Sequence, residues 1–229
     1  MTKFEEQTFE FFDDIDSGNF FSHKEFIRCY FEGCTFSSTM DVNLRSTVQN
    51  IKLIDCKITG GYIGPGIVRN TLIDGLKVGN HLQTHGTVFE AVTIKGIIDK
   101  ILITPYVDTL KKFPDVQQTF DQANDKFYKN VPWALDISEA AFKDCDIRGI
   151  PAELVKRDKE TQFILKREKA LKIDWEEIDL SKTHWKVAIE IFLRDQFEDC
   201  VLVAPKKNRK FKDLLEGLKK LKDAGILNS

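Results

Sequence analysis

The stretch that decides the fold runs from Val48 to Ile103 and opens with Val48-Gln-Asn-Ile-Lys-Leu-Ile-Asp-Cys-Lys-Ile58. Within this stretch, every fifth position is usually occupied by a large apolar residue, and a small residue usually stands two positions before it. The series is Val48, Leu53, Ile58, Ile63, Val68, Ile73, Val78, Gln83, Val88, Thr93, Ile98 and Ile103. This period fits neither an amphipathic helix nor an ordinary alternating strand. It predicts a chain that coils in a square, with one large and one small side chain pointing inward from each side.

The same stretch also repeats at a longer interval. Residues 48–58 are followed twenty residues later by the similar segment 68–78, and again by 88–98. Alternate residues of a strand share one face, and neighbouring strands lie about 4.8 Å apart. Four five-residue sides therefore predict a solenoid of stacked coils, in which each coil buries its inner face against its neighbours.

Two further stretches share this five-residue spacing. The aromatic series is Phe21, Phe26, Phe31 and Phe36, and the later series is Ile137, Phe142 and Ile147. The hexads 31–36, 53–58 and 142–147 are near copies, each with cysteine two places before its last residue. In these residues the chain resembles the pentapeptide-repeat family over about residues 20–103 and 133–150. The resemblance implies a mainly β fold, a short right-handed quadrilateral β-helix.

The resemblance is incomplete at one position, and one rival fold stays open. The residue before the central large residue is usually Asp or Asn in that family, whereas here it is Lys52, Lys57 or Lys77. Gly-Tyr-Ile-Gly-Pro-Gly at 61–66 suggests the alternative of a left-handed hexapeptide β-helix. The spacing of five rather than six favours the pentapeptide type.

The domain organisation follows from where the period stops. Residues 1–150 are predicted to form the β-helix, with an acidic, Phe-rich N-terminal cap over 1–20 and a loop near 37–43. A helical insertion is expected at about 104–132, because Pro114 precedes an apolar stripe typical of a helix over about 115–129. Residues 151–229 are predicted to form a small α-helical unit that caps the solenoid or is appended to it. Its helices are expected at about 182–197, with Ser181 as N-cap, and at about 206–223.

Cysteine use and the N-terminus indicate the compartment. The five cysteines are Cys29, Cys34, Cys56, Cys145 and Cys200, and the first four stand at the small inward position of the repeat. Buried thiols acting as small apolar groups explain them better than disulfides or a metal site. The N-terminus has no basic-then-apolar signal pattern, and no run is apolar enough to span a membrane. The sequence therefore predicts a cytoplasmic protein without membrane contact, cofactor or metal.

His81 and His85 mark the place where the repeat weakens. They flank Gln83, the one polar residue in its part of the series, so a pocket or irregular loop is expected there. Two histidines four residues apart can share a metal on a helix, but this segment is predicted to be coil and turn. Polar turn residues are the ordinary interpretation, and a site at His81 and His85 is the alternative.

A basic segment near the C-terminus is the candidate contact with a partner. Lys206, Lys207, Arg209, Lys210 and Lys212 place five cations in seven residues, on the first turns of the last expected helix. A solvated helix face is the ordinary interpretation of such a run. The net charge of −2 makes nucleic acid an unlikely partner, so the segment is a candidate contact for an unknown protein.

No catalytic constellation stands out in the chain, so the preferred function is a non-catalytic scaffold or protein-interaction module, with a homodimer possible. One alternative is an enzyme with a shallow site near His81, His85 and the 104–132 insertion. Another follows from the family resemblance, because some pentapeptide-repeat proteins mimic duplex DNA and inhibit type II topoisomerases. Residues 1–150 carry 16 basic and 21 acidic residues, which is a modest excess for such a mimic.

Overall fold

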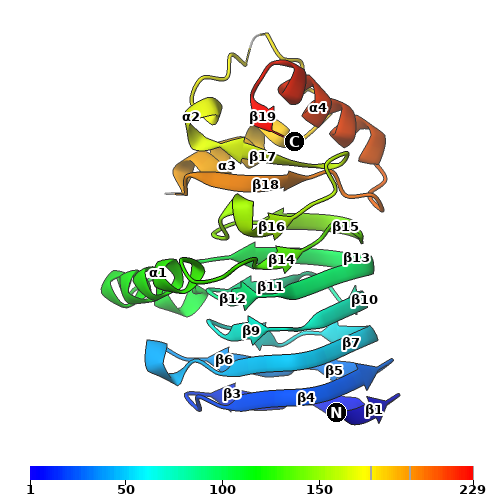
Figure 1. The fold of residues 1–229 in the computed structure, drawn as a ribbon, viewed down its shortest axis with the longest axis vertical. Helices are drawn as coiled ribbons and strands as arrows, with labels where there is room; N and C mark the ends of the chain where they lie inside the picture. The colour runs from blue at the N-terminus through cyan, green and yellow to red at the C-terminus, as the bar shows by residue number, and fades with distance from the viewer. Residues whose placement is uncertain (176, 196, 229) are drawn as a thin grey trace.

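A computed structural model describes residues 1–175, 177–195 and 197–228. The chain is mainly β, and most of its strands pair in parallel as successive rungs of a stack (Figure 1). Each coil of the stack is named here by its strands. Coil 1 holds β1 (Thr2–Glu5), β2 (Thr8–Glu10) and β3 (Asp13–Ile15); coil 2 holds β4 (Phe20–Ile27), β5 (Tyr30–Glu32) and β6 (Thr35–Ser38); coil 3 holds β7 (Thr47–Thr59) and β8 (Tyr62–Ile63).

The stack continues through three further coils to a short last strand. Coil 4 holds β9 (Ile67–Arg69), β10 (Leu72–Val78) and β11 (Leu82–His85); coil 5 holds β12 (Val88–Glu90) and β13 (Val92–Thr104); coil 6 holds β14 (Leu135–Asp136) and β15 (Ala140–Ile147), and β16 (Val155–Lys156) follows. The structure therefore confirms the prediction of a mainly β, β-helix-like solenoid. Its N-terminal coil lies at the bottom of Figure 1 and the C-terminal unit at the top.

Backbone conformation explains the five-residue sides. Residues with positive φ recur every five positions, as at Glu6, Phe11 and Asp16 in coil 1 and at His23, Arg28 and Gly33 in coil 2. A left-handed residue turns the chain sharply, so each marks a corner between two straight sides. The corner at Gly61 is the tightest, because a Cβ there would lie 2.1 Å from the carbonyl oxygen of Cys34.

The predicted inward series holds through Val78 of coil 4, is displaced by one residue from Thr84 to Ile94, and is restored at Ile98, which lies opposite Phe142. Leu72 and Ile73 of coil 4 lie opposite Thr93 and Ile94 of coil 5, 21 residues later rather than 20. The inward residues are therefore Thr84, Phe89 and Ile94, and the prediction of Gln83, Val88 and Thr93 is wrong. One extra residue around Gly79–Asn80 causes the slip, since a shift of one reverses which face a side chain points to.

Residues 1–20, expected to be a cap, contain the strands of coil 1. Phe4 and Phe9 continue the five-residue series and lie opposite Phe26 and Phe31 of coil 2. The next beat is Asp14, which is buried and accepts hydrogen bonds from Ser17, Asn19 and the backbone N–H of Ser37. Because a polar residue occupies this inward position, the five-residue repeat is difficult to recognise in the sequence of coil 1.

The insertion forms a helix on the outer wall. The helix α1 (Pro114–Tyr128) confirms the predicted helix, and it follows the short turn η2 (Asp108–Leu110). The Tyr128 hydroxyl accepts a hydrogen bond from the backbone N–H of Phe89. Beneath the helix, the buried Arg45 donates to the carbonyl oxygens of Pro65, Gly66 and Gly86, and burial lowers its pKa to about 10. A second short turn, η1 (Val42–Leu44), fills the expected loop.

The C-terminal unit is mixed α/β rather than the helical unit expected. Its antiparallel strands are β17 (Gln162–Lys166), β18 (Asp199–Val203) and β19 (Leu227–Asn228), beside η3 (Ala152–Leu154), α2 (Arg167–Ala170), α3 (Trp185–Arg194) and α4 (Phe211–Asp223). The helix α3 begins after His184 rather than at the predicted Ser181 cap. Residues 206–210 form turns instead of helix, because the N–H of Lys207 bonds to the Phe142 carbonyl and that of Lys210 to the Asn208 side chain.

The strand β18 joins the unit to the solenoid. Val201 lies opposite Ile147 of coil 6, and Val201 and Val203 pack in the core of the solenoid. The alternate residues Cys200 and Leu202 pack in the separate core of the C-terminal unit. Because neighbouring side chains of a strand point to opposite faces, β18 closes the C-terminal end of the solenoid with one face and supports the C-terminal unit with the other.

Candidate ligand-binding cavity

The interior of the N-terminal half of the solenoid is hollow. A cavity of about 530 Å³ extends through coils 1 to 5 and is lined by their inward side chains. At a coil spacing of about 4.8 Å it is roughly 20 Å long. The lining residues are Phe4, Phe9, Phe12, Phe21, Lys24, Phe26, Phe31, Cys34, Thr35, Phe36, Val48, Ile51, Leu53, Ile58, Ile63, Val68, Thr71, Ile73, Leu76, Leu82, Thr84, Thr87, Phe89 and Val92.

Packing of the inward columns explains where the hollow begins and ends. In coils 5 and 6 the inward Ile98, Ile137 and Phe142 are at most 1% exposed, so this half of the core is filled. In coils 1 to 4 the corresponding aromatic and aliphatic side chains are only partly buried. Phe89 and Val92 therefore form the floor of the cavity, and Phe4, stacked on Phe26 at 5.0 Å, lies at its other end.

The cavity reaches the N-terminal end of the stack. The strands β1 to β3 pair with coil 2 on one edge and with no strand on the other among the described residues. Phe12, which lines the cavity, is 47% exposed. The two ends of the solenoid thus differ: β18 covers one end, and the other exposes the interior.

Within the described residues, the lining is apolar apart from six groups, and three of these have hydrogen-bond partners. Thr71 and Thr87 donate their hydroxyls to the carbonyl oxygens of Arg69 and Gly64. The Cys34 thiol is partly buried and lies 3.4 Å from the Phe9 carbonyl oxygen, so it bridges coils 1 and 2. The remaining polar groups among the described lining residues are the Thr35 and Thr84 hydroxyls and the ammonium of Lys24.

Lys24 stands at an inward position of the repeat. It precedes Phe26 by two residues, the place that Cys29 and Cys34 hold before Phe31 and Phe36. Its backbone lies opposite Thr2 of coil 1 and Ile51 of coil 3. The Lys24 ammonium lies 5.7 Å from the centroid of the Phe4 ring, so it reaches toward the open end.

The two predicted histidines have different surroundings. His81 is exposed, and His85 is buried with its ring stacked on Tyr62 at a centroid distance of 5.2 Å. The Nδ1 atom of His85 lies 3.3 Å from the carbonyl oxygen of Tyr106. Throughout the described ranges, no three His, Cys, Asp or Glu side chains lie close enough together to hold a metal ion.

The predicted basic segment lies in the turn before α4. Lys206, Lys207, Arg209 and Lys210 are exposed. Lys206 pairs with Asp158 at 2.9 Å, and Asn208 donates to the carbonyl oxygen of Lys143. The segment therefore links the C-terminal unit to coil 6 and presents its other cations to solvent.

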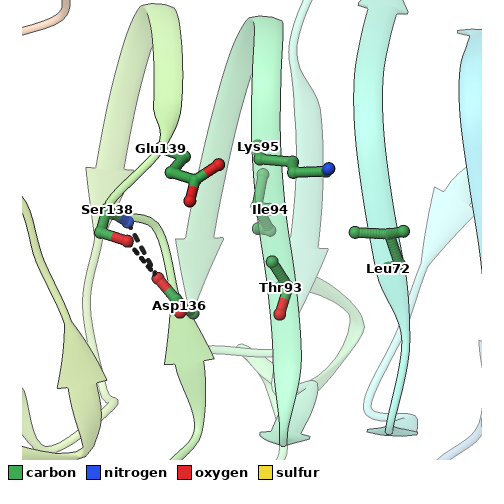
Figure 2. A pocket seen from close by; sticks show the side chains of 7 residues that line it. All are labelled: Leu72, Thr93, Ile94, Lys95, Asp136, Ser138 and Glu139. Carbon is green, nitrogen blue, oxygen red and sulfur yellow. Dashed lines mark hydrogen bonds between the residues drawn. The ribbon is translucent and has the colours of Figure 1, made fainter.

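A smaller hollow of about 260 Å³ lies on the outer wall, beside β10, β13 and the turn after β14 (Figure 2). The Asp136 carboxylate accepts hydrogen bonds from the Ser138 N–H and hydroxyl, at 3.1 and 2.6 Å. Lys95 pairs with Asp74 at 3.2 Å. These polar groups satisfy one another, so we regard this hollow as ordinary surface.

A third hollow, of about 340 Å³, lies between β15, β18 and α3. The Arg148 guanidinium lies 3.2 Å from the Asp146 carboxylate and 3.1 Å from that of Asp195. The Tyr106 hydroxyl donates to Asp195, and burial together with this carboxylate raises the pKa of Tyr106 to about 12. Burial also lowers the pKa of His184 at the same place. The charges pair across the boundary between solenoid and C-terminal unit, so the site joins the two parts.

Comparisons with protein-family models, curated proteins and solved structures found no significant match to this chain. None of the helices within the described residues has the length and apolar character needed to cross a membrane.

Sequence reasoning did not identify the cavity as a site. The inward position of Lys24 could have been predicted from the sequence, because Lys24 stands two residues before Phe26 in the repeat. The cavity itself could not be predicted from the sequence, because its volume depends on how completely the inward side chains of neighbouring coils fill the space between them.

Proposed function

We propose that this protein is a non-catalytic binding protein that holds an elongated apolar molecule in the hollow core of its solenoid. The observation that carries the proposal is the cavity of about 530 Å³, open at the N-terminal end and lined almost entirely by apolar side chains. Ligand sites in proteins are typically concave and mostly apolar, with a few polar groups that orient the ligand. A narrow hollow about four coils deep suits a linear aliphatic chain better than a compact molecule.

The free energy of an empty cavity supports an occupant. Apolar side chains that line an unfilled hollow lack packing partners on one side, which is unfavourable compared with a close-packed core. Each methylene group buried in the hollow would contribute about 0.8 kcal/mol in the opposite direction.

The test is a titration with saturated alcohols from decanol to hexadecanol, read by native mass spectrometry and thermal shift. We expect a one-to-one complex whose affinity rises with chain length, by about fourfold for each methylene. Val68→Phe fills the hollow and should abolish binding. Ile97→Phe is the matched control, because Ile97 is 56% exposed on the outer wall of β13. Absence of a one-to-one complex, or equal binding by Val68→Phe, would refute the proposal.

A protein-interaction module is the second candidate function, and the free edge of coil 1 favours it. Unpaired strand edges accept a strand from another chain, and Phe11, Phe12, Ile15 and Phe20 at this end are all at least 47% exposed. The test is light scattering across a range of protein concentrations. Association that Phe12→Glu/Phe20→Glu abolishes would support a homodimer through this end, and a monomer at every concentration would exclude it.

For the fold itself, we propose the right-handed pentapeptide type. Corners every five residues, and rungs 19 to 23 residues apart outside the longer connections between coils 2 and 3 and between coils 5 and 6, support four-sided coils. A hexapeptide helix with three sides would repeat at about 18 residues. A crystal structure tests the hand directly, and a left-handed path would exclude the pentapeptide type.

A further inference from the structure

We infer that Lys24 recognises an anionic head group, so that the ligand is a long-chain carboxylate whose tail fills the cavity and whose head lies near the open end. This inference rests on the proposed function. It names the chemical class of the ligand and its direction in the hollow.

The cavity wall carries one charge. Within the part of the chain that the structure describes, Lys24 is the only charged side chain that lines the cavity. A charge in apolar surroundings is unfavourable unless it has a partner. Among the described residues no carboxylate or hydrogen-bond acceptor contacts the Lys24 ammonium, which lies over the face of the Phe4 ring. A ligand carboxylate would supply the missing counter-charge.

The acidic residues near Lys24 already have partners outside the cavity. Glu5 pairs with Lys3 at 3.0 Å and with Arg28 at 2.7 Å. Glu25 follows Lys24 directly and lies 3.7 Å from Lys52. These carboxylates alternate with inward residues and so lie on the outer wall, where solvent screens them. Within the described residues, the partly exposed Lys24 ammonium near the open end therefore has no carboxylate partner.

The place of Lys24 gives the ligand a direction. Lys24 belongs to coil 2, next to the open end, and its ammonium reaches toward Phe4 of coil 1. Beyond it, the hollow continues past Leu53 and Ile73 to Phe89, and the described residues that line this part carry no charge. A molecule with one anionic end and one aliphatic tail matches this arrangement only if its tail enters first.

The experiment compares tetradecanoate with tetradecanol at submicellar concentrations, using calorimetry and the carboxyl NMR signal of [1-¹³C]tetradecanoate. We expect the wild-type protein to bind the carboxylate at least about tenfold more tightly, because charge-assisted hydrogen bonds are the strong ones. Lys24→Met should bind both compounds equally, and Lys24→Arg should restore the preference. Lys57→Met is the matched control, since Lys57 is exposed and lies over the Tyr30 ring on the outer wall at 4.6 Å.

The outcomes separate the two proposals. If the wild-type protein binds neither compound, the proposed function fails and this inference fails with it. If it binds both equally and Lys24→Met changes nothing, the cavity binds apolar chains and the inference about Lys24 is wrong. Binding only to vesicles of anionic phospholipid, with no complex of the free compounds, would also overturn it.

Discussion

The guanidinium of Arg148 lies 3.1 Å from the carboxylate of Asp195, and this ion pair joins coil 6 to the end of α3. Both side chains are largely shielded from solvent, at 18% and 10% exposure. Removing one partner of such a pair leaves an uncompensated charge. We expect Arg148→Met to lower the free energy of unfolding by about 3 kcal/mol, measured by urea denaturation. Arg148→Met/Asp195→Leu should recover much of the loss; additive losses would show that the two charges do not interact.

The inward place of Cys56 gives a second prediction. Cys56 is fully buried, and its thiol lies 3.4 Å from the Phe26 carbonyl oxygen of the preceding coil. We expect Cys56→Lys to cost more than about 4 kcal/mol, because it places an unpaired charge in a close-packed column. Circular dichroism during thermal unfolding measures this. Ile54→Lys, on the outer wall two residues earlier, should retain the fold; equal melting of both variants would contradict the assignment of faces.

Substitutions at two glycines distinguish the cost of backbone strain from the cost of a steric clash between coils. Both Gly61 and Gly225 have positive φ, but a Cβ would collide with Cys34 at Gly61, whereas at Gly225 it would meet no atom of the described residues within 4 Å. Gly225→Ala should cost about 1 kcal/mol, the strain of a left-handed alanine. Gly61→Ala should cost several times more, since the coils must move apart. Chemical denaturation of the two variants tests this, and similar losses would mean that the contact between coils 2 and 3 is looser.

The solenoid was the most predictable part of the chain. The large residue at every fifth position and the small residue two before it follow directly from how strand side chains alternate, so the inward places of Leu53 and Cys56 were predictable. The slip near Gly79 was not, because one inserted residue leaves apolar residues on both faces of the next sides, as at Val88 and Phe89. The first coil was not predicted for a related reason, because the third inward position of its repeat is occupied by the buried polar residue Asp14.

The C-terminal unit shows a different limit. The apolar run around β18 is buried on both faces, and such a run cannot be distinguished from a buried helix by its period. The start of α4 depends on hydrogen bonds of Lys207 and Lys210 that involve residues distant in sequence or a local turn. The candidate cavity was beyond prediction because the volume left between inward side chains is set by three-dimensional packing.

Asp99 gives a prediction about pH. Burial alone would raise its pKa, but hydrogen bonds from Lys143 and from the Val78 N–H outweigh burial, so the net effect lowers the pKa below the usual value of 3.8. A carboxyl whose pKa is lower in the folded state stabilises the protein above its unfolded pKa, and this contribution disappears as the pH falls through the folded value. Asp99→Asn should therefore melt a few degrees lower at pH 7. The difference should shrink as the pH falls below about 4; a difference independent of pH would contradict the argument.

The unequal ends of the solenoid have a consequence for how the molecule loosens. In a stack where each coil touches only its neighbours, opening starts from the end with fewer contacts and spreads rung by rung. Coil 1 is held on one edge, whereas β18 ties coil 6 to a second core. Amide hydrogen exchange should therefore be fastest in β1–β3 and slow steadily toward β15, so that fraying is directional. A ligand that contacts the first four coils at once would couple their opening. The gradient of exchange rates would then be replaced by a single cooperative unfolding transition of these coils.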